Sequence, residues 1–307
     1  MYGKKLIKYM PVFMSVMILF SGCEAQKTVA DENAEINIPQ NAVISYLGPE
    51  GTYTEEAAKL FFGAESDTRP QKTVSDAVDM LLNGNCDYAV IPQENTIGGP
   101  VYDYIDEFLS HKELSVVGEV ELPIRQALMA KDGVSLDNID TVYSHKQGIA
   151  QGADWLKNNL PDAEIIEVSS TAEGAKMVSE SDSDNCAAIA SVGAARVYGL
   201  SVLAENIQMN EDNKTRFYVL STDEPQENSS GRMVFTACGE AAELSKLLSK
   251  TEKLGLPPLY IHDRPEKTVM GRYIWLIECE GGDFDDFKKI ADDTELELQY
   301  RGAFPVK

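Results

Sequence analysis

Positive charge is scarce in this sequence. Its 307 residues include 27 Lys and Arg but 50 Asp and Glu, which gives a formal net charge of −23 at pH 7. A surface this acidic repels the phosphate backbone of nucleic acids and anionic lipid headgroups. We therefore expect no nucleic-acid partner, and any anionic ligand must be held by local cations and backbone N–H groups.

Histidine is also scarce, and the motifs of several enzyme classes are absent. The three histidines, His111, His145 and His262, lie far apart in the sequence. There is no H-E-x-x-H, no G-x-S-x-G and no Walker motif, so a metal hydrolase, a serine hydrolase or an NTPase is not expected.

The N-terminus carries a short apolar run. Three lysines precede the stretch from Pro11 to Phe20, which is too short to cross a bilayer comfortably. It ends in Ser21-Gly22-Cys23, and small residues before a cysteine resemble a bacterial lipoprotein signal that leaves lipid on Cys23. An uncleaved anchor is the alternative. We expect residues 1–22 to be a signal peptide, residues 23–40 a flexible tether, and the protein to lie outside the cytoplasm, anchored to a membrane.

Cysteine pairs at metal-binding spacing are missing as well. The five cysteines contain no C-x-x-C pair. With Cys23 assigned to lipid, an even number remains in a compartment that permits disulfides, although buried free thiols are at least as common. Both outcomes stay open for Cys86, Cys186, Cys238 and Cys279.

Residues 41–222 alternate short apolar runs with amphipathic stretches. The runs predict strands, and the stretches between them predict helices. Such alternation is typical of an α/β fold with a largely parallel sheet. The predicted strands are 42–47, 88–91, 141–143, 164–168 and 187–190, and the predicted helices are 55–62, 75–82, 102–109, 149–158, 172–179 and 192–198.

Four of these helices begin with a full or near capping-box pattern. Thr52, Thr73, Ser144 and Ser170 each precede an acid or a glutamine by three residues. Helix N-termini present free N–H groups and the positive end of the helix dipole, which favour bound anions. In an open α/β sheet, ligands bind beyond the carboxyl ends of the strands, where such helices begin. The pattern predicts a cleft that holds a carboxylate-bearing ligand, although each cap alone needs no ligand to explain it.

A second module follows a polar linker near residues 222–231. Its predicted elements are the strand 232–238, the helix 241–254, the strands 259–262 and 272–279, the helix 283–290 and the strand 295–300. This βαββαβ order is the ferredoxin-like arrangement, and we assign the module to residues 231–307.

Five short motifs resemble those of prephenate dehydratases, in the order and spacing of that family. They are a glycine-rich turn (46–54), a Pro-x-Glu-Asn segment (91–99), a His-x-Gln stretch (144–151), a Ser-Thr turn (169–172) and Asn213–Phe217, with its Thr-Arg-Phe core. Residues 231–305 resemble the ACT regulatory domain that usually follows. The resemblance implies a two-lobed fold like that of a type 2 periplasmic binding protein, with the active site between the lobes. It implies neither a metal nor another cofactor.

The resemblance also implies a reaction and roles for individual residues. Prephenate would lose carbon dioxide and its ring hydroxyl to become phenylpyruvate, a step of phenylalanine biosynthesis. Thr215 would hydrogen-bond that hydroxyl and help deliver a proton, while Glu94 would be the ultimate proton donor or would fix Asn95. Arg216 would support the pocket or pair with a substrate carboxylate. The implied substrate-binding residues are Thr52, Asn95, Thr96, Gln147, Ser170, Thr171, Arg216 and Phe217, and His145 is a weaker candidate for a general acid.

The chain departs from the family pattern at three cleft positions. Thr96 replaces a serine, Lys146 replaces a proline and Met209 replaces an aspartate. The first change keeps the hydroxyl, and the second places an extra cation near the cleft mouth. The third affects the loop that leads to Thr215.

The second module matches its family less closely. Arg264 and Pro265 stand where the family binds phenylalanine, but the glutamate and serine that precede them there are missing. Phenylalanine binding at these two residues is one expectation, and a purely structural module that forms a homodimer or a larger oligomer is the other. In this fold the first and third strands are neighbours, so a disulfide between Cys238 and Cys279 is a testable hypothesis.

Two other functions remain open from the sequence. A membrane-tethered lipoprotein that captures an aromatic acid as a solute would share the two-lobed fold, because fold does not determine function. An arogenate dehydratase would differ only in how it meets the amino group of its substrate. The hydroxyl of Thr215 favours an enzyme, because a binding protein needs no hydroxyl directed at a leaving group.

Overall fold

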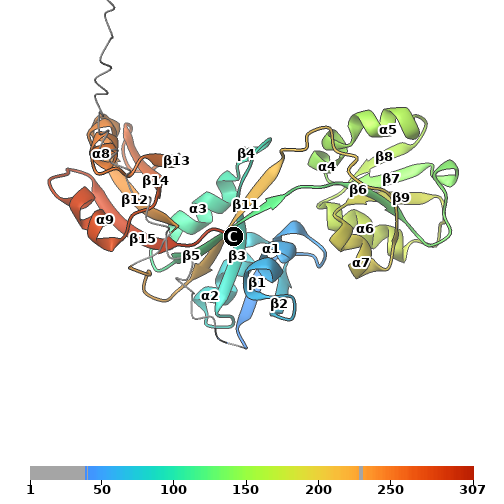
Figure 1. The fold of residues 1–307 in the computed structure, drawn as a ribbon, viewed down its shortest axis with the longest axis horizontal. Coiled ribbons are helices and arrows are strands. Elements are labelled where there is room, and N and C mark those ends of the chain that lie inside the picture. Colours follow the sequence, from blue (N-terminus) through green and yellow to red (C-terminus); the bar gives the residue numbers. More distant parts are fainter. Residues whose placement is uncertain (1–38, 40, 228–230) are drawn as a thin grey trace, which may run out of the picture. The chain divides into compact units, whose positions relative to one another are not determined.

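The computed structural model describes residues 39, 41–227 and 231–307, whose strands form three β-sheets (Figure 1). We call these sheets A, B and C. The expected signal peptide, the expected lipid site Cys23 and most of the expected tether lie outside the described residues. Among the described helices, none is long and apolar enough to cross a membrane.

Sheet A and its helices form lobe A from two separate parts of the chain. The strand order is β2-β1-β3-β11-β5, with β4 paired to β3. Strands β1, β2 and β3 are parallel, but β11 is antiparallel to both of its neighbours, so the sheet is mixed rather than largely parallel. The elements are β1 (Val43–Leu47), α1 (Tyr53–Phe62), β2 (Asp67–Gln71), α2 (Val74–Leu82), β3 (Tyr88–Asn95), β4 (Gly99–Pro100), α3 (Tyr102–Ser110), β5 (Ser115–Pro123) and β11 (Lys214–Ser221).

Sheet B and its helices form lobe B. The strand order is β10-β6-β9-β7-β8, in which β7, β8 and β9 are parallel and β6 is antiparallel to its neighbours. The helix predicted over 149–158 is two helices with a break at Gly152. The elements are β6 (Ala127–Ala130), η1 (Leu136–Asn138), β7 (Thr141–Ser144), α4 (Lys146–Gln151), α5 (Ala153–Asn159), β8 (Glu164–Glu167), α6 (Thr171–Glu180), β9 (Cys186–Ala190), α7 (Val192–Tyr198) and β10 (Ser201–Ala204).

The chain crosses between the lobes twice, after β5 and before β11. The two crossing segments are hydrogen-bonded to each other. The N–H of Ile124 donates to the carbonyl of Asn213 at 2.8 Å, and the N–H of Ile207 donates to the carbonyl of Gln126 at 3.0 Å. These crossings bring residues of both lobes to one cleft.

Sheet C confirms the predicted βαββαβ order. Its strand order is β13-β14-β12-β15, with the first and third strands of the module side by side as expected. All six predicted elements are present, and the strands extend further than predicted. They are β12 (Arg232–Glu240), α8 (Ala241–Lys253), β13 (Pro258–Pro265), β14 (Arg272–Glu280), α9 (Phe284–Ala291) and β15 (Glu297–Phe304).

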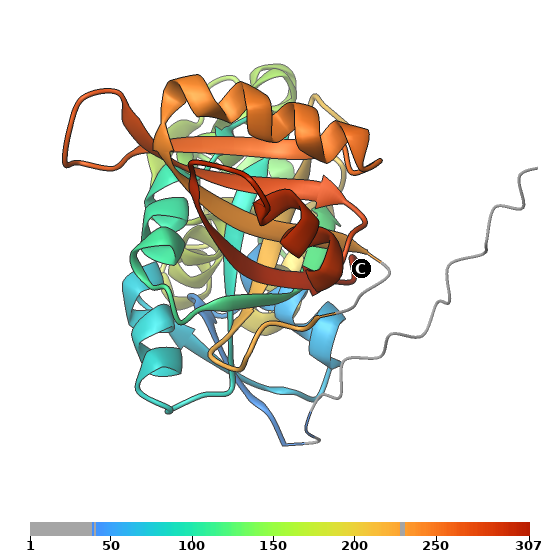
Figure 2. The same cartoon turned by 90° about the vertical axis from the view of Figure 1, so that its left-hand side faces the viewer.

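The two faces of sheet C have different partners. On one face, apolar side chains such as Phe235 and Ile277 pack with α8 and α9, which Figure 2 shows in orange and dark red. On the other face, Leu276 and Phe304 share a core with Tyr218 of lobe A. Side chains alternate between the faces of a strand, and β12, β14 and β15 each contribute residues to both cores. Sheet C is therefore packed directly against the sheet that carries Thr215.

Polar contacts add to this packing. The buried guanidinium of Arg301, on β15, donates to the carbonyl of His111 at 2.7 Å, at the C-terminal end of α3. A helix C-terminus carries partial negative charge and stabilises a cation. Burial nevertheless lowers the pKa of Arg301 to about 10. The last residues of the chain then run along β5, where the N–H of Lys307 donates to the carbonyl of Glu119 at 2.9 Å.

The expected disulfide between Cys238 and Cys279 is wrong. Strands β12 and β14 are neighbours, but their register places Cys238 opposite Ile274 and Cys279 opposite Met233. The four cysteines in the described part of the chain are all free thiols. Burial raises the pKa of the Cys279 thiol to about 12, which keeps this group protonated and unreactive.

Candidate active site

A cavity of about 220 Å³ is lined by residues of both lobes. Lobe A contributes the ends of β1 and β3 and the start of β11, and lobe B contributes the starts of α4 and α6. Of the described residues, no Lys, Arg, Asp or Glu lines this cavity. Its polar lining consists of Thr52, Tyr53, Thr54, Asn95, Tyr104, Gln126, His145, Gln147, Gln151, Ser169, Ser170, Thr171 and Thr215.

Thr215 and Asn95 lie opposite each other on the paired strands β11 and β3. The Oδ1 atom of Asn95 accepts the backbone N–H groups of Ile97 and Gly98 at 3.0 and 2.8 Å, which fixes the orientation of the amide because a backbone N–H only donates. Nδ2 of Asn95 therefore donates to Oγ1 of Thr215 at 2.9 Å. Since Oγ1 accepts this bond, the hydroxyl hydrogen of Thr215 is left to donate to a ligand.

Three helices begin at the cavity. Thr52 caps α1 and Ser170 caps α6, as predicted, with hydroxyl oxygens that accept backbone N–H groups at 3.4 and 3.0 Å. The prediction for α4 needs a correction: Nδ1 of His145 accepts the N–H of Gln147 at 3.3 Å, whereas Ser144 donates to a buried carbonyl. The remaining N–H groups and dipoles at these helix starts favour an anionic ligand.

Two glutamines complete the lining of the cavity, and sequence reasoning had assigned a role to neither. Nε2 of Gln126 donates to Oε1 of Gln151 at 2.8 Å. Oε1 of Gln126 is buried and has no hydrogen-bond partner among the described residues, which leaves an unused acceptor at the cavity. Gln151 ends the 144–151 motif and could have been found there, but Gln126 lies in no motif.

A second cavity of about 670 Å³ adjoins the first and shares five lining residues with it. Charged groups occur here: Lys72 from lobe A and Lys176 from lobe B line it, together with Glu50 and Glu173. In the described part of the chain, neither lysine forms an ion pair or a side-chain hydrogen bond. The extra cation Lys146 is exposed in the first turn of α4 and does not line either cavity. We call the first cavity the inner cavity and the second one the outer cavity. The cations available to a ligand in this cleft, Lys72 and Lys176, therefore line the outer cavity and not the inner one.

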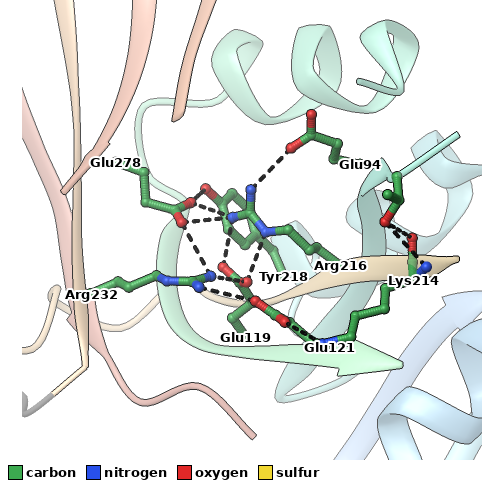
Figure 3. Close-up of polar contacts among 9 residues, drawn as sticks. Glu94, Glu119, Glu121, Lys214, Arg216, Tyr218, Arg232 and Glu278 are labelled. Carbon is green, nitrogen blue, oxygen red and sulfur yellow. Dashed lines mark hydrogen bonds and ion pairs between the residues drawn. The ribbon is translucent and has the colours of Figure 1, made fainter. Parts of the chain in front are cut away.

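The prediction for Glu94 and the expected pairing of Arg216 with a substrate carboxylate need correction, whereas support of the pocket by Arg216 stays open. Successive side chains of a strand point to opposite faces, so Thr215 meets the cavity while Arg216 points toward sheet C (Figure 3). The Arg216 guanidinium donates to both carboxylate oxygens of Glu119 at 2.8 Å and to both of Glu278 at 2.7 Å. It also donates to Glu94 at 3.2 Å. Arg216 is thus occupied by protein carboxylates, and Glu94 lies on the face of its strand opposite Asn95.

We call the charged residues behind β11 the carboxylate cluster: Glu94, Glu119, Glu121, Lys214, Arg216, Arg232 and Glu278. Three cations meet four carboxylates, so one negative charge is in excess. Burial and the neighbouring Glu119 raise the pKa of Glu278 to about 7. The carboxylates, in turn, keep the buried Arg216 protonated, with a pKa above its usual value.

The other predicted residues fall into two groups. Gln147, Thr171 and Phe217 line the cavity, and Phe217 is also fully buried in the core of lobe A. Thr96 does not line it. Its hydroxyl bonds both backbone groups of Lys214, at 3.1 and 3.2 Å, and so joins β3 to the start of β11.

The predicted effector residue Arg264 is bound to lobe A. Its guanidinium donates to both carboxylate oxygens of Asp106 and lies 4.9 Å from the centre of the Tyr102 ring. Both partners belong to α3, the helix that also carries the cavity residue Tyr104. Arg264 thus connects the second module to the cleft, and Pro265 ends the same strand.

Together these features define a two-lobed α/β protein whose cleft offers hydroxyls, amides and helix N-termini to a small carboxylate-bearing ligand. Among the described residues, no group of three or more His, Cys, Asp or Glu could hold a metal. Residues 44–225 match the prephenate dehydratase family. The chain belongs to this family, and the α/β fold expected from the resemblance is confirmed.

Named relatives agree with this assignment. The chain is 38% identical to a bifunctional chorismate mutase/prephenate dehydratase of Neisseria gonorrhoeae, over 78% of this chain and 66% of that protein. It is 33% identical to a protein of the same name from Aquifex aeolicus, over 89% of this chain and 76% of the relative. The solved prephenate dehydratase of Arthrobacter aurescens, in complex with L-Phe, is 27% identical with a TM-score of 0.77, over 86% of this chain and 90% of that one.

Proposed function

We propose that this chain is a prephenate dehydratase. Prephenate is a dianion whose ring becomes aromatic when a carboxylate leaves as carbon dioxide and the ring hydroxyl leaves as water. The reaction consumes one proton, which the departing oxygen takes up, and yields phenylpyruvate. Aromatisation drives the decarboxylation, so the protein must hold the substrate and assist the departing oxygen.

The direction of the Thr215 hydrogen bond is the observation that supports this proposal best. Asn95 donates to Oγ1, and the threonine hydrogen is therefore free to point at the substrate. Threonine is a weak acid, so we assign it the role of an oriented donor that stabilises charge on the departing oxygen. Oε1 of Gln126, the unused acceptor, is available to hold the hydrogen of the same ring hydroxyl before it leaves.

Both substrate carboxylates need partners in this acidic protein. We assign one to the helix starts capped by Thr52 and Ser170, where N–H groups and dipoles substitute for a fixed cation. We assign the other to the outer cavity, beside Lys72 and Lys176. This placement keeps the reacting ring in the inner cavity.

An activity assay with matched variants of Thr215 tests the proposal. The full chain, purified in detergent, is given prephenate, and phenylpyruvate is followed by its absorbance. Thr215→Val keeps the shape but removes the hydroxyl, and we expect kcat to fall about 10²- to 10³-fold with a nearly unchanged KM. Thr215→Ser keeps the hydroxyl and should retain most of the activity. Prephenate binding without product would instead identify a solute-binding protein, and a preference for arogenate would identify an arogenate dehydratase.

We also propose that L-phenylalanine is an effector of the second module. The solved relative from Arthrobacter aurescens is in complex with L-Phe, and Arg264 and Pro265 are retained here. Calorimetry with L-phenylalanine, on the wild type and on Arg264→Met, tests this site. We propose a homodimer or larger oligomer as the working assembly, which light scattering would measure.

A third proposal concerns location. The N-terminal pattern supports a lipoprotein that is tethered outside the cytoplasm through Cys23. Mass spectrometry of the N-terminal peptide should find lipid on this cysteine. Cys23→Ser should move the protein from the membrane fraction to the soluble fraction, and an unchanged distribution would argue against lipidation.

A further inference from the structure

We propose that Glu278, on strand β14 of the second module, is a positioning residue for the active site: by holding Arg216 from behind, it fixes the part of β11 that presents Thr215 to the substrate. This inference rests on the proposed prephenate dehydratase activity. It assigns a role in that reaction to a side chain that does not line the cleft and belongs to a different sheet.

Glu278 contacts two residues of β11, Arg216 and Tyr218, which are neighbours on the face of the strand that points away from the cavity. Both of its oxygens accept from the Arg216 guanidinium at 2.7 Å, and one also accepts from the hydroxyl of Tyr218. Glu278 and Arg216 are 1% and 6% exposed, so water does not compete for these bonds. The Tyr218 ring lies between Phe108 and Phe304, with centroid distances of 6.0 and 5.9 Å, which further limits movement of this strand.

The pairing of β11 with β3 is irregular beside Thr215, whereas its pairing with β5 is regular from Lys214 to Val219. Thr215 pairs with Asn95 and Arg216 with Glu94, but Phe217 pairs with Pro92, which leaves one extra residue on β3. A bulge disrupts the local ladder of hydrogen bonds and redirects the side chains beside it. On this side of β11, the bonds of the adjacent Arg216 to Glu94 and Glu278 therefore add to the backbone ladder that β5 provides on the other side.

Four strands besides β14 also contribute groups that contact this guanidinium or its partners. Glu119 on β5 and Glu94 on β3 bind Arg216 directly, and Arg232 on β12 lies 3.5 Å from Glu278. On β13, the Tyr260 ring lies 3.6 Å from the Arg216 guanidinium carbon. The same strand carries the buried His262, whose pKa is lowered by burial and which interacts electrostatically with Glu94 and Arg216. Glu278 is the carboxylate of this group that comes from the second module, and burial and Glu119 raise its pKa to about 7. Because its ionised form accepts from Arg216 with both oxygens, we expect the supported state of β11 to form as the pH rises through about 7.

The experiment compares Glu278→Gln with Glu280→Gln in the full chain purified in detergent. Gln keeps the size of the side chain but removes the charge, and Glu280 is an exposed residue of the same strand, two positions away. For Glu278→Gln we expect kcat at pH 8 to fall about 10- to 100-fold, the effect of a small misplacement of a reacting group, with KM within about twofold of wild type. Glu280→Gln should match wild type.

Two further readouts separate positioning from a merely structural role. The wild-type kcat should rise between pH 6 and 8, around the pKa of about 7, and this rise should vanish in Glu278→Gln. Hydrogen–deuterium exchange of the β11 amides should be faster in Glu278→Gln, while the exchange of lobe B stays the same. Glu278→Asp, which keeps the charge, should restore part of kcat.

The outcomes distinguish this inference from the proposed function. A wild type without prephenate turnover would refute the activity, and the exchange of β11 would still report whether Glu278 holds the strand. Equal kcat and equal exchange in Glu278→Gln and wild type would overturn the positioning role. A loss of kcat with an unchanged pH profile and unchanged β11 exchange would do so as well.

Discussion

On one face of strand β11, Thr215 and Phe217 meet the cavity with neutral side chains, whereas on the other face Arg216 and Tyr218 enter a buried group of carboxylates and cations. The neighbouring strand β3 is divided in the same way. Asn95 faces Thr215, and Glu94, one residue earlier, faces Arg216. On both strands, the side chains on the face toward the cavity are thus uncharged, and the charged side chains lie on the opposite face.

This separation suits a dianionic substrate. A carboxylate inside the cavity would repel the substrate, and an arginine there would bind substrate and transition state about equally, which does not raise kcat. Neutral donors held in fixed directions stabilise charge as it develops. The strong electrostatic interactions lie one residue away, where they hold the strand without contacting the ligand.

Removing Arg216 should disturb the charged face most. Arg216→Met leaves Glu119 and Glu278 buried without their main cation, and we expect a loss of about 3–5 kcal/mol of unfolding free energy in urea denaturation. Adding Glu278→Gln removes one of the stranded charges. The double variant should therefore recover about 1–3 kcal/mol relative to the single variant. Additive losses would show that the two residues do not interact energetically.

A change on the neutral face should affect catalysis more than stability. Asn95→Asp keeps the shape and can still accept from the N–H groups of Ile97 and Gly98. A carboxylate cannot donate to Thr215, so the threonine hydrogen turns toward the new carboxylate and is lost to the substrate. We expect kcat to fall about 10²-fold or more, as on loss of an oriented donor.

Thermal unfolding provides the control for this variant. The melting temperature of Asn95→Asp should fall, but by less than that of Arg216→Met, because the side chain keeps its bonds from Ile97 and Gly98 and loses those that Nδ2 donates to Oδ1 of Asn213 and the carbonyl of Lys214. A variant with wild-type kcat would show that the direction of the Asn95–Thr215 bond does not matter. A variant that unfolds readily would place Asn95 among the structural residues instead.

The sequence predicted the neutral face better than the charged face. Thr52, Ser170, Asn95 and Thr215 lie in short local motifs, and helix capping and strand pairing follow from local rules. Arg216 was expected in the cleft beside Thr215, although the two-residue period of a strand sends neighbouring side chains to opposite faces. Its partners Glu119 and Glu278 are 97 and 62 residues away in the sequence, and no local pattern shows such contacts.

The register between β12 and β14 could not be predicted from the sequence either. The order of the second module was predicted in full, and so was the adjacency of β12 and β14. The offset between the two strands depends on which side chains pack between α8, α9 and lobe A, and it separates Cys238 from Cys279. Topology thus follows from the hydrophobic pattern, whereas individual pairs depend on tertiary packing.

The carboxylate cluster should also make the free energy of unfolding depend on pH. The pKa of Glu278 is raised from its usual 4.5 to about 7, so the folded state binds this proton more tightly than the unfolded state does. Its contribution is fully present below about pH 4.5 and is lost as the pH rises through about 7. We expect the wild type to lose on the order of 1–3 kcal/mol more than Glu278→Gln between pH 5 and 8, measured by urea denaturation. Parallel curves would mean that Glu278 titrates normally.

The smallest effect is expected for a change at Lys176, a cation that lines the outer cavity. Lys176 lies on α6 beside the capping residue Ser170 and forms no ion pair among the described residues. A partly exposed cation of this kind attracts a dianion weakly, so Lys176→Gln should raise the KM for prephenate about two- to fourfold and leave kcat unchanged. Lys157→Gln removes the same charge from an exposed position on α5, outside both cavities, and should leave KM unchanged.

Salt provides the second test of Lys176. Screening weakens a partly exposed charge pair, so the difference in KM between Lys176→Gln and wild type should shrink as ionic strength rises, while kcat stays constant. An equal rise of KM in Lys157→Gln would show that the net charge of the protein matters rather than the position of Lys176. A fall in kcat would place Lys176 at the reacting ring. The ring would then be held by a charged group as well as by the uncharged residues of the inner cavity.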